Sequence, residues 1–362
     1  MRPEARVLVT GSGGLAGVNF VRALRASRRD YYIVGTDFNK YHLVYPDVNL
    51  RLLTPRHSDP TFIPRVAAIV KEEKLQFLHA QPSSEAYVIA KSREKVPCRV
   101  FLPDSRVMKV GQDKLLSQQA LAKKKVPVAR TQSLSSTSDI KDAFSELGSP
   151  LWVRARHGAG GRLSLLCYNE REAAHWVELW VLKGSKVDEF IVQEYLPGRN
   201  IAWDSIWHEG RLVTSYSRER LEYPFKHISP SGITGTPSVA RIVVDDSVNE
   251  VAVAAVRAMD PKPHGAYSVD LKESSTGTMC VTEVDSGKFH STMPLWGYIA
   301  VKHLRMPWYA NLADLYVRLG LGEEVKDSIP STDLLPEGYY LLRDMDVGAF
   351  LWREDGWKEK VL

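Results

Sequence analysis

The chain has 362 residues, of which 44% are apolar and 25% are charged. These proportions are ordinary for a globular protein and exclude a disordered, collagen-like or low-complexity chain. Apolar runs stay well short of the roughly 20 residues that a membrane helix needs. The strand-like run Val7–Val9 begins so early that we expect no signal peptide. Three widely separated cysteines, Cys98, Cys167 and Cys280, favour a reducing compartment, so we expect a cytoplasmic protein.

Positive charge is concentrated in the first third of the chain. Residues 1–130 carry 23 Lys and Arg against 11 Asp and Glu, whereas the remainder carries 25 against 32. A basic segment can face anionic ligands, including nucleic acid. The clusters Arg25–Arg29 and Lys123–Lys125, however, look like helix ends, where cations complement the helix dipole. We therefore expect neither nucleic acid nor a membrane as a partner.

The first part of the chain alternates between short β-rich runs and helical runs. Predicted strands are Arg6–Thr10, Tyr31–Thr36 and Phe77–Ala80, and predicted helices are Val18–Ala26, Phe62–Glu73 and Glu85–Arg93. This alternation favours a parallel, doubly wound sheet. A strongly helical stretch from Asp113 to Lys124 follows and ends before Pro127, which cannot continue it.

After Thr131 the pattern changes to strands rich in β-branched and aromatic residues. The predicted strands are Leu151–Arg154, Phe190–Glu194, Ile201–Trp207, Arg211–Tyr216, Ala240–Val244, Tyr267–Lys272 and Met279–Val284, with helices at Glu170–Lys183 and Ser247–Met259. An α+β body therefore follows an α/β head. The last stretch, 316–362, is typical of a strand-containing cap and carries no assignable chemistry.

The glycine-rich loop Gly11–Gly17 follows a strand and opens a helix, and Asp37 ends the next strand. This pattern fits a dinucleotide-binding turn, in which the helix N-terminus holds phosphate and the acid binds a ribose hydroxyl. Tyr87 and Lys91 also match the Tyr-x-x-x-Lys pair of short-chain reductases and epimerases. The alternative is a tight turn in which glycine serves geometry only. The loop by itself leaves both interpretations open.

Four later segments carry a more specific pattern: Gly111–Thr131, Ser149–Arg162, Val192–Asp204 and Gly265–Phe289. In this order and spacing they resemble the ATP-grasp superfamily, with the nearest likeness to a single synthetase unit of carbamoyl-phosphate synthetase large subunits. The resemblance covers nearly the whole chain. It implies a Rossmann-like pre-ATP-grasp head that does not carry NAD, a small lid and a larger core. The expected limits are 1–108 for the head, 109–190 for the linking helix and lid, 191–315 for the core and 316–362 for the cap.

The resemblance also implies a nucleotide site. Lys114 and Arg154 occupy the two cationic positions that neutralise ATP phosphates, and the planar fork of Arg154 suits phosphate. Gly158, Gly160 and Gly161 belong to the expected mobile loop that closes over the phosphates through backbone N–H groups.

The adenine-reading hinge of this family falls on the end of a predicted strand. It is formed by Gln193, Glu194, Tyr195 and Leu196. We expect mostly backbone contacts there, with the carboxylate of Glu194 reaching the adenine amino group or the ribose edge. Asn200 stands where many relatives have Glu, which weakens a ribose role. Asp204 is assigned to the nucleotide site as a residue that orders the hinge.

Three carboxylates are the expected metal ligands. Asp270 and the pair Glu283 and Asp285 lie on strands that should be adjacent, and the pair shares one face because side chains alternate along a strand. Carboxylates converging on one face repel unless a cation lies between them. Mg²⁺, with Mn²⁺ as an alternative, prefers such oxygen ligands and accompanies ATP. Asp270 replaces the usual Gln or Glu of the family, and Asp285 replaces its Asn.

Lys288, Arg154 and Ser231 are the expected catalytic residues. Lys288 replaces an Arg that contacts the transferred phosphoryl group, which preserves the charge but not the bidentate contact. Ser231 begins a Ser-Gly run that resembles a loop contacting phosphate or substrate, although such a run also fits a plain turn. Arg218 and Arg220 either meet a carboxylate substrate or are solvated.

The resemblance implies an ATP- and Mg-dependent ligase. A small-molecule carboxylate would form an acyl phosphate, and an amine or another nucleophile would displace the phosphate. Carbamoyl-phosphate synthesis itself is not expected, because that enzyme needs two such units. Two alternatives remain open: an NAD(P)-dependent oxidoreductase, and a degenerate ATP-binding protein without turnover. The sequence also leaves open whether the chain forms a homo-oligomer.

Overall fold

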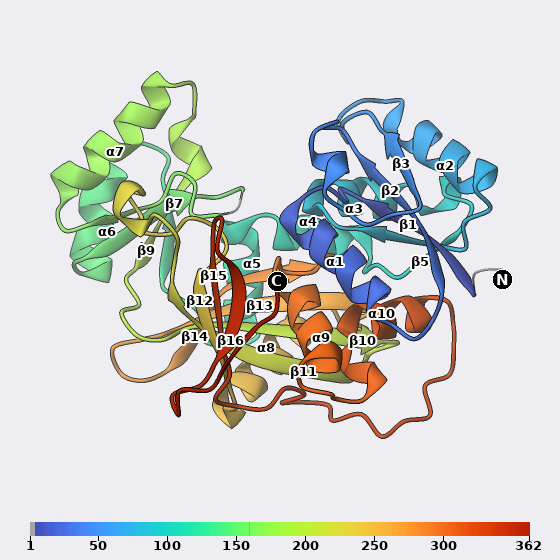
Figure 1. The fold of residues 1–362 in the computed structure, drawn as a ribbon. Coiled ribbons are helices and arrows are strands. Elements are labelled where there is room, and N and C mark those ends of the chain that lie inside the picture. The colour runs from blue at the N-terminus through green and yellow to red at the C-terminus, as the bar shows by residue number, and fades with distance from the viewer. Residues whose placement is uncertain (1–3, 159) are drawn as a thin grey trace.

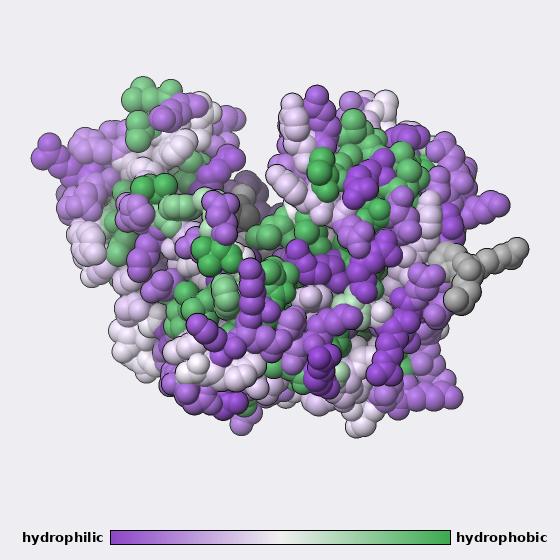
Figure 2. Space-filling view, in the orientation of Figure 1, coloured by the Kyte–Doolittle hydropathy of each residue, from purple (hydrophilic) through white to green (hydrophobic). Residues whose placement is uncertain are grey.

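The computed structural model of the chain describes residues 4–158 and 160–362. Three sheets divide it into a head, a lid and a core, with the head and the lid standing side by side on the core (Figure 1). A hollow separates the head from the lid on the face shown in Figure 2. Within the described residues, we find no helix whose length and apolar character would allow it to cross a membrane.

The head is the expected parallel α/β layer. Its five strands lie in the order β3-β2-β1-β4-β5, and every neighbouring pair is parallel. Its elements are β1 (Ala5–Thr10), α1 (Leu15–Arg25), β2 (Tyr31–Asp37), β3 (Leu50–Leu53), α2 (Phe62–Glu72), β4 (Phe77–Ala80), α3 (Ser83–Lys91) and β5 (Arg99–Val100), with short 3-10 helices at His42–Val44 and Arg93–Lys95. The buried strands carry apolar residues on both faces, as a sheet covered on two sides requires.

Two helices link the head to the lid. α4 (Ser105–Gly111) is capped by Asp104, and α5 (Lys114–Lys123) is capped by Asp113. The Asp113 carboxylate accepts hydrogen bonds from the backbone N–H groups of Leu115 and Leu116, which satisfies donors that the first turn leaves free. The cap fixes the start of α5 and thereby the position of Lys114.

The lid is a four-stranded antiparallel sheet in the order β6-β9-β7-β8. Its elements are β6 (Thr131–Ser133), α6 (Asp139–Leu147), β7 (Leu151–Ala155), β8 (Leu165–Cys167), α7 (Glu170–Leu182), a 3-10 turn at Val187–Glu189 and β9 (Phe190–Glu194). The alternating apolar residues of β7 and β9 pack against α6 and α7 in one buried cluster. The lid therefore has an apolar core of its own.

The core is built on an eight-stranded sheet in the order β14-β13-β10-β11-β12-β15-β16-β17. Its elements are β10 (Asn200–His208), β11 (Arg211–Glu222), β12 (Val239–Val243), α8 (Asp246–Met259), β13 (Gly265–Glu273), β14 (Met279–Ser286), α9 (Met293–Lys302), α10 (Leu312–Gly320), β15 (Tyr340–Asp344), β16 (Gly348–Trp352) and β17 (Lys358–Lys360), with 3-10 turns at Lys226–Ile228 and Trp308–Ala310. The mixture of a parallel head with antiparallel lid and core sheets confirms the expected fold class.

The C-terminal stretch is part of the large sheet. β15 pairs with β12 through Val239 and Leu342, and β16 and β17 continue the sheet outward. Helix α10 runs across the boundary expected at residue 315. Leu341 and Leu351 are buried in the same apolar cluster as the core helices, so burial ties this stretch to the core rather than placing it as a separate cap.

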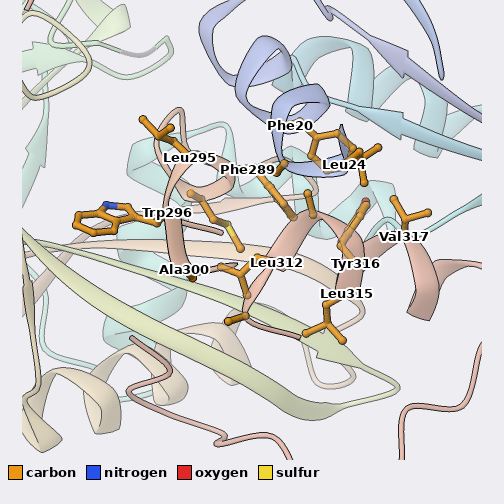
Figure 3. Packing of buried hydrophobic residues seen from close by; sticks show 14 of the residues in the cluster. Phe20, Leu24, Phe289, Leu295, Trp296, Ala300, Leu312, Leu315, Tyr316 and Val317 are labelled. Carbon is orange, nitrogen blue, oxygen red and sulfur yellow. The ribbon is translucent and has the colours of Figure 1, made fainter. Parts of the chain in front are cut away.

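Apolar packing fixes the head on the core. Phe20 of α1 lies against Phe289 and Tyr316, with ring centres 5.4 and 6.3 Å apart, and Leu24 and Trp296 belong to the same buried cluster (Figure 3). The burial of several large side chains stabilises such a contact by roughly 1.5–3 kcal/mol each. The loop that opens α1 is therefore held against the core sheet, beside the residues that follow β14.

Candidate functional site

The three expected metal ligands lie on paired strands at one edge of the core sheet. In the antiparallel register of β13 and β14, Asp270 is opposite Glu283, and Ser268 is opposite Asp285. All three carboxylates line one open pocket of about 420 Å³. The sheet register therefore brings them together as expected from their spacing.

Glu283 lies between two cations that come from other parts of the molecule. The Nζ of Lys114, at the start of α5, is 3.6 Å from one carboxylate oxygen. A guanidinium nitrogen of Arg154, on β7 of the lid, donates to the other at 3.2 Å. The two expected phosphate-binding cations and one expected metal ligand thus form a single cluster where linking helix, lid and core meet.

The other two carboxylates also have basic partners. Arg220 donates to Asp270 at 2.6 Å, and the Nζ of Lys288 is 2.9 Å from Asp285. The Nε2 of His290 faces both acids, at 3.8 Å from Asp270 and 3.7 Å from Asp285. Arg220 reaches this position because β11 continues to Glu222, beyond the predicted strand end at Tyr216.

The basic partners affect the pKa of Asp270 and of Asp285 more than burial does. Burial by itself would raise the pKa of Asp270, but Arg220 and His290 hold that pKa below its ordinary value. In the same way Lys288 and His290 hold the pKa of Asp285 far below the usual range. Burial would lower the pKa of Lys288, but Asp285 raises it. The acids are therefore ionised and Lys288 is charged at neutral pH, as oxygen ligands and a phosphate-binding cation require.

Lys114 differs from Lys288 in this respect. Its side chain is only 4% exposed, and burial lowers its pKa in spite of the nearby Glu283. A buried ammonium is stabilised by additional negative charge. Lys114 is therefore suited to bind an incoming phosphate.

Asp204 lies beneath this cluster and does not line the pocket. It is fully buried and paired with Arg218, while Ser268 donates to it at 2.7 Å and the Nδ1 of His290 is 2.8 Å away. The assignment of Asp204 to the nucleotide site is therefore corrected: it orients His290 and Arg218 from below. Sequence spacing did not reveal this role, because its partners lie on β11, on β13 and beyond β14.

The expected phosphate loop lies against the loop that contains Ser231. Gly158, Gly160 and Gly161 all have positive φ, at 101°, 73° and 71°. The carbonyl of Gly158 accepts a hydrogen bond from Lys114. A Cβ at Gly161 would lie 3.0 Å from the carbonyl oxygen of Ile233, so the two loops are in direct contact.

Ser231 contributes to this loop contact. Its hydroxyl donates to the carbonyls of Gly161, at 3.5 Å, and Ile233, at 3.3 Å, and accepts from the N–H of Ile233 at 3.2 Å. These three partners are backbone groups of the two loops. We therefore propose Ser231 as a residue that positions the loops.

Two side chains of the hinge already have hydrogen-bond partners within the protein. The carboxylate of Glu194 accepts from the backbone N–H and the guanidinium of Arg130, each at 2.8 Å. Gln193 is buried, and its amide donates to Thr131 at 2.9 Å. The expected contact of the Glu194 carboxylate with adenine or ribose stays a prediction, and it requires the nucleotide to compete with Arg130 for that carboxylate.

The remaining hinge residues face a lysine from the core. Lys272 donates to the carbonyl of Leu196 at 2.7 Å and lies 5.1 Å from the centre of the Tyr195 ring. Leu196 packs in a small cluster with Ala129 and Cys280. The hinge is therefore fixed to β13 and β14, the strands that carry the three carboxylates.

The head glycine loop forms the opposite wall of the pocket. The lining residues from the head are Gly11, Gly14, Leu15, Ala16, Gly17, Gln81, Pro82 and Ser83, and those from the other lobes include Gly160, Arg218, Arg220, Thr236 and Lys288. The first turn of α1 carries no acidic side chain. Because this first turn lines the pocket, the free N–H groups and the positive end of the helix dipole lie at the pocket wall.

The structure excludes the dinucleotide interpretation of this loop. Asp37 is buried, and its carboxylate accepts from the N–H groups of Gly13, at 3.2 Å, and Asn39, at 2.9 Å. A Cβ at Gly13 would lie 2.5 Å from the backbone of His42, so the segment after β2 packs directly on the loop. A ribose has no access to Asp37. Tyr87, on α3, packs against the apolar cluster of the head and is not among the residues that line the pocket.

Two features of the site were missed from the sequence. The sequence analysis assigns no role to His290, although it follows Lys288 by only two residues, and that proximity is the available signal. The glycine loop was expected either to form a tight turn or to bind NAD. In the structure it lines the pocket that the three carboxylates share. The position of the glycine loop depends on the docking of the head on the core, and that of His290 on the pairing of the core strands, and no local motif specifies either.

Comparison with known proteins gives one family match and many similar structures. Residues 111–292, half of the chain, match a RimK-like ATP-grasp domain. An L-amino acid ligase from Bacillus licheniformis superposes with a TM-score of 0.68 at 12% identity, covering 94% of this chain and 79% of that one. An N5-carboxyaminoimidazole synthetase from Staphylococcus aureus gives a TM-score of 0.66 at 15% identity, covering 94% and 83%.

A biotin carboxylase domain of a 2-oxoglutarate carboxylase from Hydrogenobacter thermophilus, in complex with MgADP and bicarbonate, gives a TM-score of 0.69 at 15% identity. It covers 94% of this chain and 74% of that one. At these identities the similar structures establish the fold, and the family follows from the match over residues 111–292. The expected resemblance is thereby confirmed: the chain belongs to the RimK-like ATP-grasp family and is an ATP-dependent ligase.

Proposed function

We propose that the protein activates a small-molecule carboxylate as an acyl phosphate with ATP and Mg²⁺, and joins it to an amine or another nucleophile. The observation that carries this proposal is the position of Glu283, which contacts both Lys114 and Arg154 at the meeting point of linking helix, lid and core. ATP bound between lid and core would bring its phosphates to these two cations. The L-amino acid ligase among the similar structures supports an amino acid or a related small carboxylate as the substrate class.

The residues present fit a divalent cation. Asp270, Glu283 and Asp285 offer ionised oxygen ligands on one face of two paired strands, which is the donor set that Mg²⁺ and Mn²⁺ prefer. When bound, the metal supplies neutralisation of the phosphate charge. When no metal is bound, Arg220 neutralises the charge of Asp270 and Lys288 neutralises that of Asp285.

The chain contributes positioning and charge rather than a nucleophilic triad. Lys114 and Arg154 release Glu283 and turn to the triphosphate, and the lid loop at Gly160–Gly161 closes over it with backbone N–H groups. Lys288 lies next to Asp285, where it can contact the transferred phosphoryl group. Such pre-arranged cations lower the barrier of phosphoryl transfer by stabilising charge on the equatorial oxygens.

The carboxylate and its acceptor would occupy the part of the pocket beside α1. That part is walled by Gly14, Ala16 and Gln81 of the head and faces Lys288 and His290 of the core. The apolar contact between α1 and α9 holds this wall in place. The substrate is thus held between head and core, and ATP between lid and core. We place the protein in the cytoplasm, where ATP is abundant and its three free thiols stay reduced.

Binding and turnover can be tested separately. MgATP should raise the melting temperature and NAD(P) should not, because ligands stabilise only the state that binds them. Release of ADP and phosphate should then appear with a pool of amino acids and other small carboxylates plus amines. Stabilisation by NAD(P) alone would contradict the proposal, and MgATP binding without ADP formation in any mixture would favour the degenerate, non-catalytic alternative.

Hydrogen exchange gives the matching structural test. MgATP should protect the backbone around Gly160–Gly161 and the facing loop 231–236, because their N–H groups gain partners and lose water. MgATP alone should leave the head loop Gly11–Gly17 unchanged, and the productive carboxylate should then protect it. Protection of Gly11–Gly17 by MgATP with no change at Gly160–Gly161 would contradict this arrangement.

A further inference from the structure

A second cluster of side chains that could hold a metal ion lies at the start of β13, the strand on which Asp270 lies, and at the adjacent end of β10. β10 ends at His208, and Glu209 and Gly210 form the turn into β11. In the antiparallel register of β10 and β13, Trp207 is paired with Gly265, so His208 stands opposite His264. The turn thus brings two imidazoles and one carboxylate to a single edge of the sheet.

Their ligand atoms converge without any rearrangement of the backbone. One nitrogen of each histidine and one oxygen of Glu209 all lie within 4.8 Å of one another. The Nδ1 of His264 is 3.1 Å from the Glu209 carboxylate, and the two imidazole centres are 5.5 Å apart. Two histidines and a carboxylate are a common ligand set for Zn²⁺, which completes its coordination with water.

The surroundings hold this cluster in place. Gly210 donates to the carbonyl of Pro263 at 2.9 Å, which ties the turn to the residue before His264. The ring of Phe101 packs edge-on against His264 with centres 4.5 Å apart.

We propose that His208, Glu209 and His264 form a second metal site, specific for Zn²⁺ or a similar transition-metal ion and separate from the ATP-grasp carboxylates. Asp270 lies six residues after His264, and Asp285 is opposite Ser268, four residues after His264, so at about 3.3 Å per residue these acids lie roughly 20 Å and 13 Å away along the strand. The ion would join the β10–β11 turn to the start of β13. It would lie beside Phe101, where the chain leaves the head. It would stabilise the junction between head and core.

Lys262 provides the sharpest test of the proposal. Its ammonium pairs with Glu209 and its side chain is 69% exposed, so it competes with a metal for the carboxylate without belonging to the apolar core. Lys262→Ala should therefore bind Zn²⁺ several times more tightly than the unaltered protein. A structural role of the cluster alone would not produce this gain.

The experiment is a titration with Zn²⁺ against a chromophoric chelator, in excess Mg²⁺ to occupy the catalytic carboxylates. One Zn²⁺ should bind per chain, and His208→Ala and His264→Ala should each weaken binding by about 100-fold or more. Glu209→Gln should weaken it without changing the size of the side chain. His175→Ala is the matched control, because His175 pairs with Glu178 on the lid surface at 3.2 Å but has no second histidine in the pair.

Zn²⁺ should also raise the melting temperature of the unaltered protein and of His175→Ala, and leave that of His264→Ala unchanged. X-ray absorption should show two imidazole nitrogens at about 2.0 Å from the metal. The absence of stoichiometric binding would overturn the proposal. So would binding that survives His208→Ala and His264→Ala at unchanged strength, since the ion would then lie elsewhere, whatever the outcome for ATP turnover.

Discussion

The guanidinium of Arg154 and the carboxylate of Glu283 lie 3.2 Å apart, although Arg154 belongs to the lid sheet and Glu283 to the core sheet. Lys114 of the linking helix approaches the same carboxylate at 3.6 Å. This contact connects the three parts of the molecule that must enclose a nucleotide. It also replaces the mutual repulsion expected for neighbouring carboxylates with attraction to two cations.

This contact sets the expected effect of Glu283→Gln. Turnover should fall more than tenfold, a barrier increase above about 1.4 kcal/mol, because the proposed metal site loses the charge of one oxygen ligand. The free energy of unfolding should also fall, by about 1–3 kcal/mol, since Lys114 is buried and loses its partner. Carboxylate repulsion alone would predict the opposite sign. Activity assays and thermal unfolding test both effects, with the exposed strand-end substitution Glu222→Gln as the control.

Lys288 should act on the chemical step. Lys288→Met removes the cation beside Asp285 and should lower kcat by about 100-fold or more, with a smaller change in the KM for ATP. Lys288→Arg should recover part of the loss, because the charge is restored. Steady-state kinetics separate the two parameters, and Lys302→Met, at the exposed C-terminal end of the mostly buried α9, should leave both unchanged. If Lys288 had only a structural role, Lys288→Met would lower the melting temperature and leave the kcat of the folded protein unchanged.

Gly161 should be required for the contact between the two phosphate-site loops. It has φ 71°, and an added Cβ would lie 2.9 Å from the Cβ of Ile233. Gly161→Ala should therefore raise the KM for ATP and reduce kcat/KM by about tenfold, or about 1.4 kcal/mol. Gly184→Ala isolates the backbone cost, because Gly184 has φ 98° and open space around it among the described residues. Equal kinetic effects of the two substitutions would contradict a role for the loop contact.

Glu85 in the first turn of α3 should make the head less stable at alkaline pH. Burial raises the pKa of its carboxyl to about 7, so between pH 4.5 and 7 the folded chain binds more protons than the unfolded chain. The contribution of Glu85 to the free energy of unfolding therefore falls as pH rises through this window.

Glu85→Gln removes this contribution and should stabilise the protein at pH 8 by up to about 3 kcal/mol, with little difference at pH 5. Denaturant unfolding at both pH values measures the difference between the variant and the unaltered chain. The exposed substitution Glu94→Gln should show no such pH-dependent gain. A loss of stability at pH 8 in Glu85→Gln would show that the carboxylate is ionised and favourably bound.

Local patterns in the sequence determined most of the elements and the candidate ligand set. Glu283 and Asp285 share a face because side chains alternate along β14, and α5 begins at Lys114 because Asp113 caps it. These features depend on residues that are close along the chain. Their geometry therefore follows from periodicity and from capping chemistry.

Tertiary structure decided which polar groups remain available to a ligand. Arg130 occupies the carboxylate of Glu194, and the segment at His42 closes the space beside Gly13 that a dinucleotide would need. Asp204 is buried beneath His290 rather than exposed at the hinge. In each case the partner lies on another loop or element. Arg130 and His290 are tens of residues away along the chain from Glu194 and Asp204, respectively. The sequence by itself determined the ligase family and the identity of its charged residues, whereas long-range packing decided which groups those residues pair with. The physical reason is that a buried charge is stabilised only by the groups that the fold brings into contact with it.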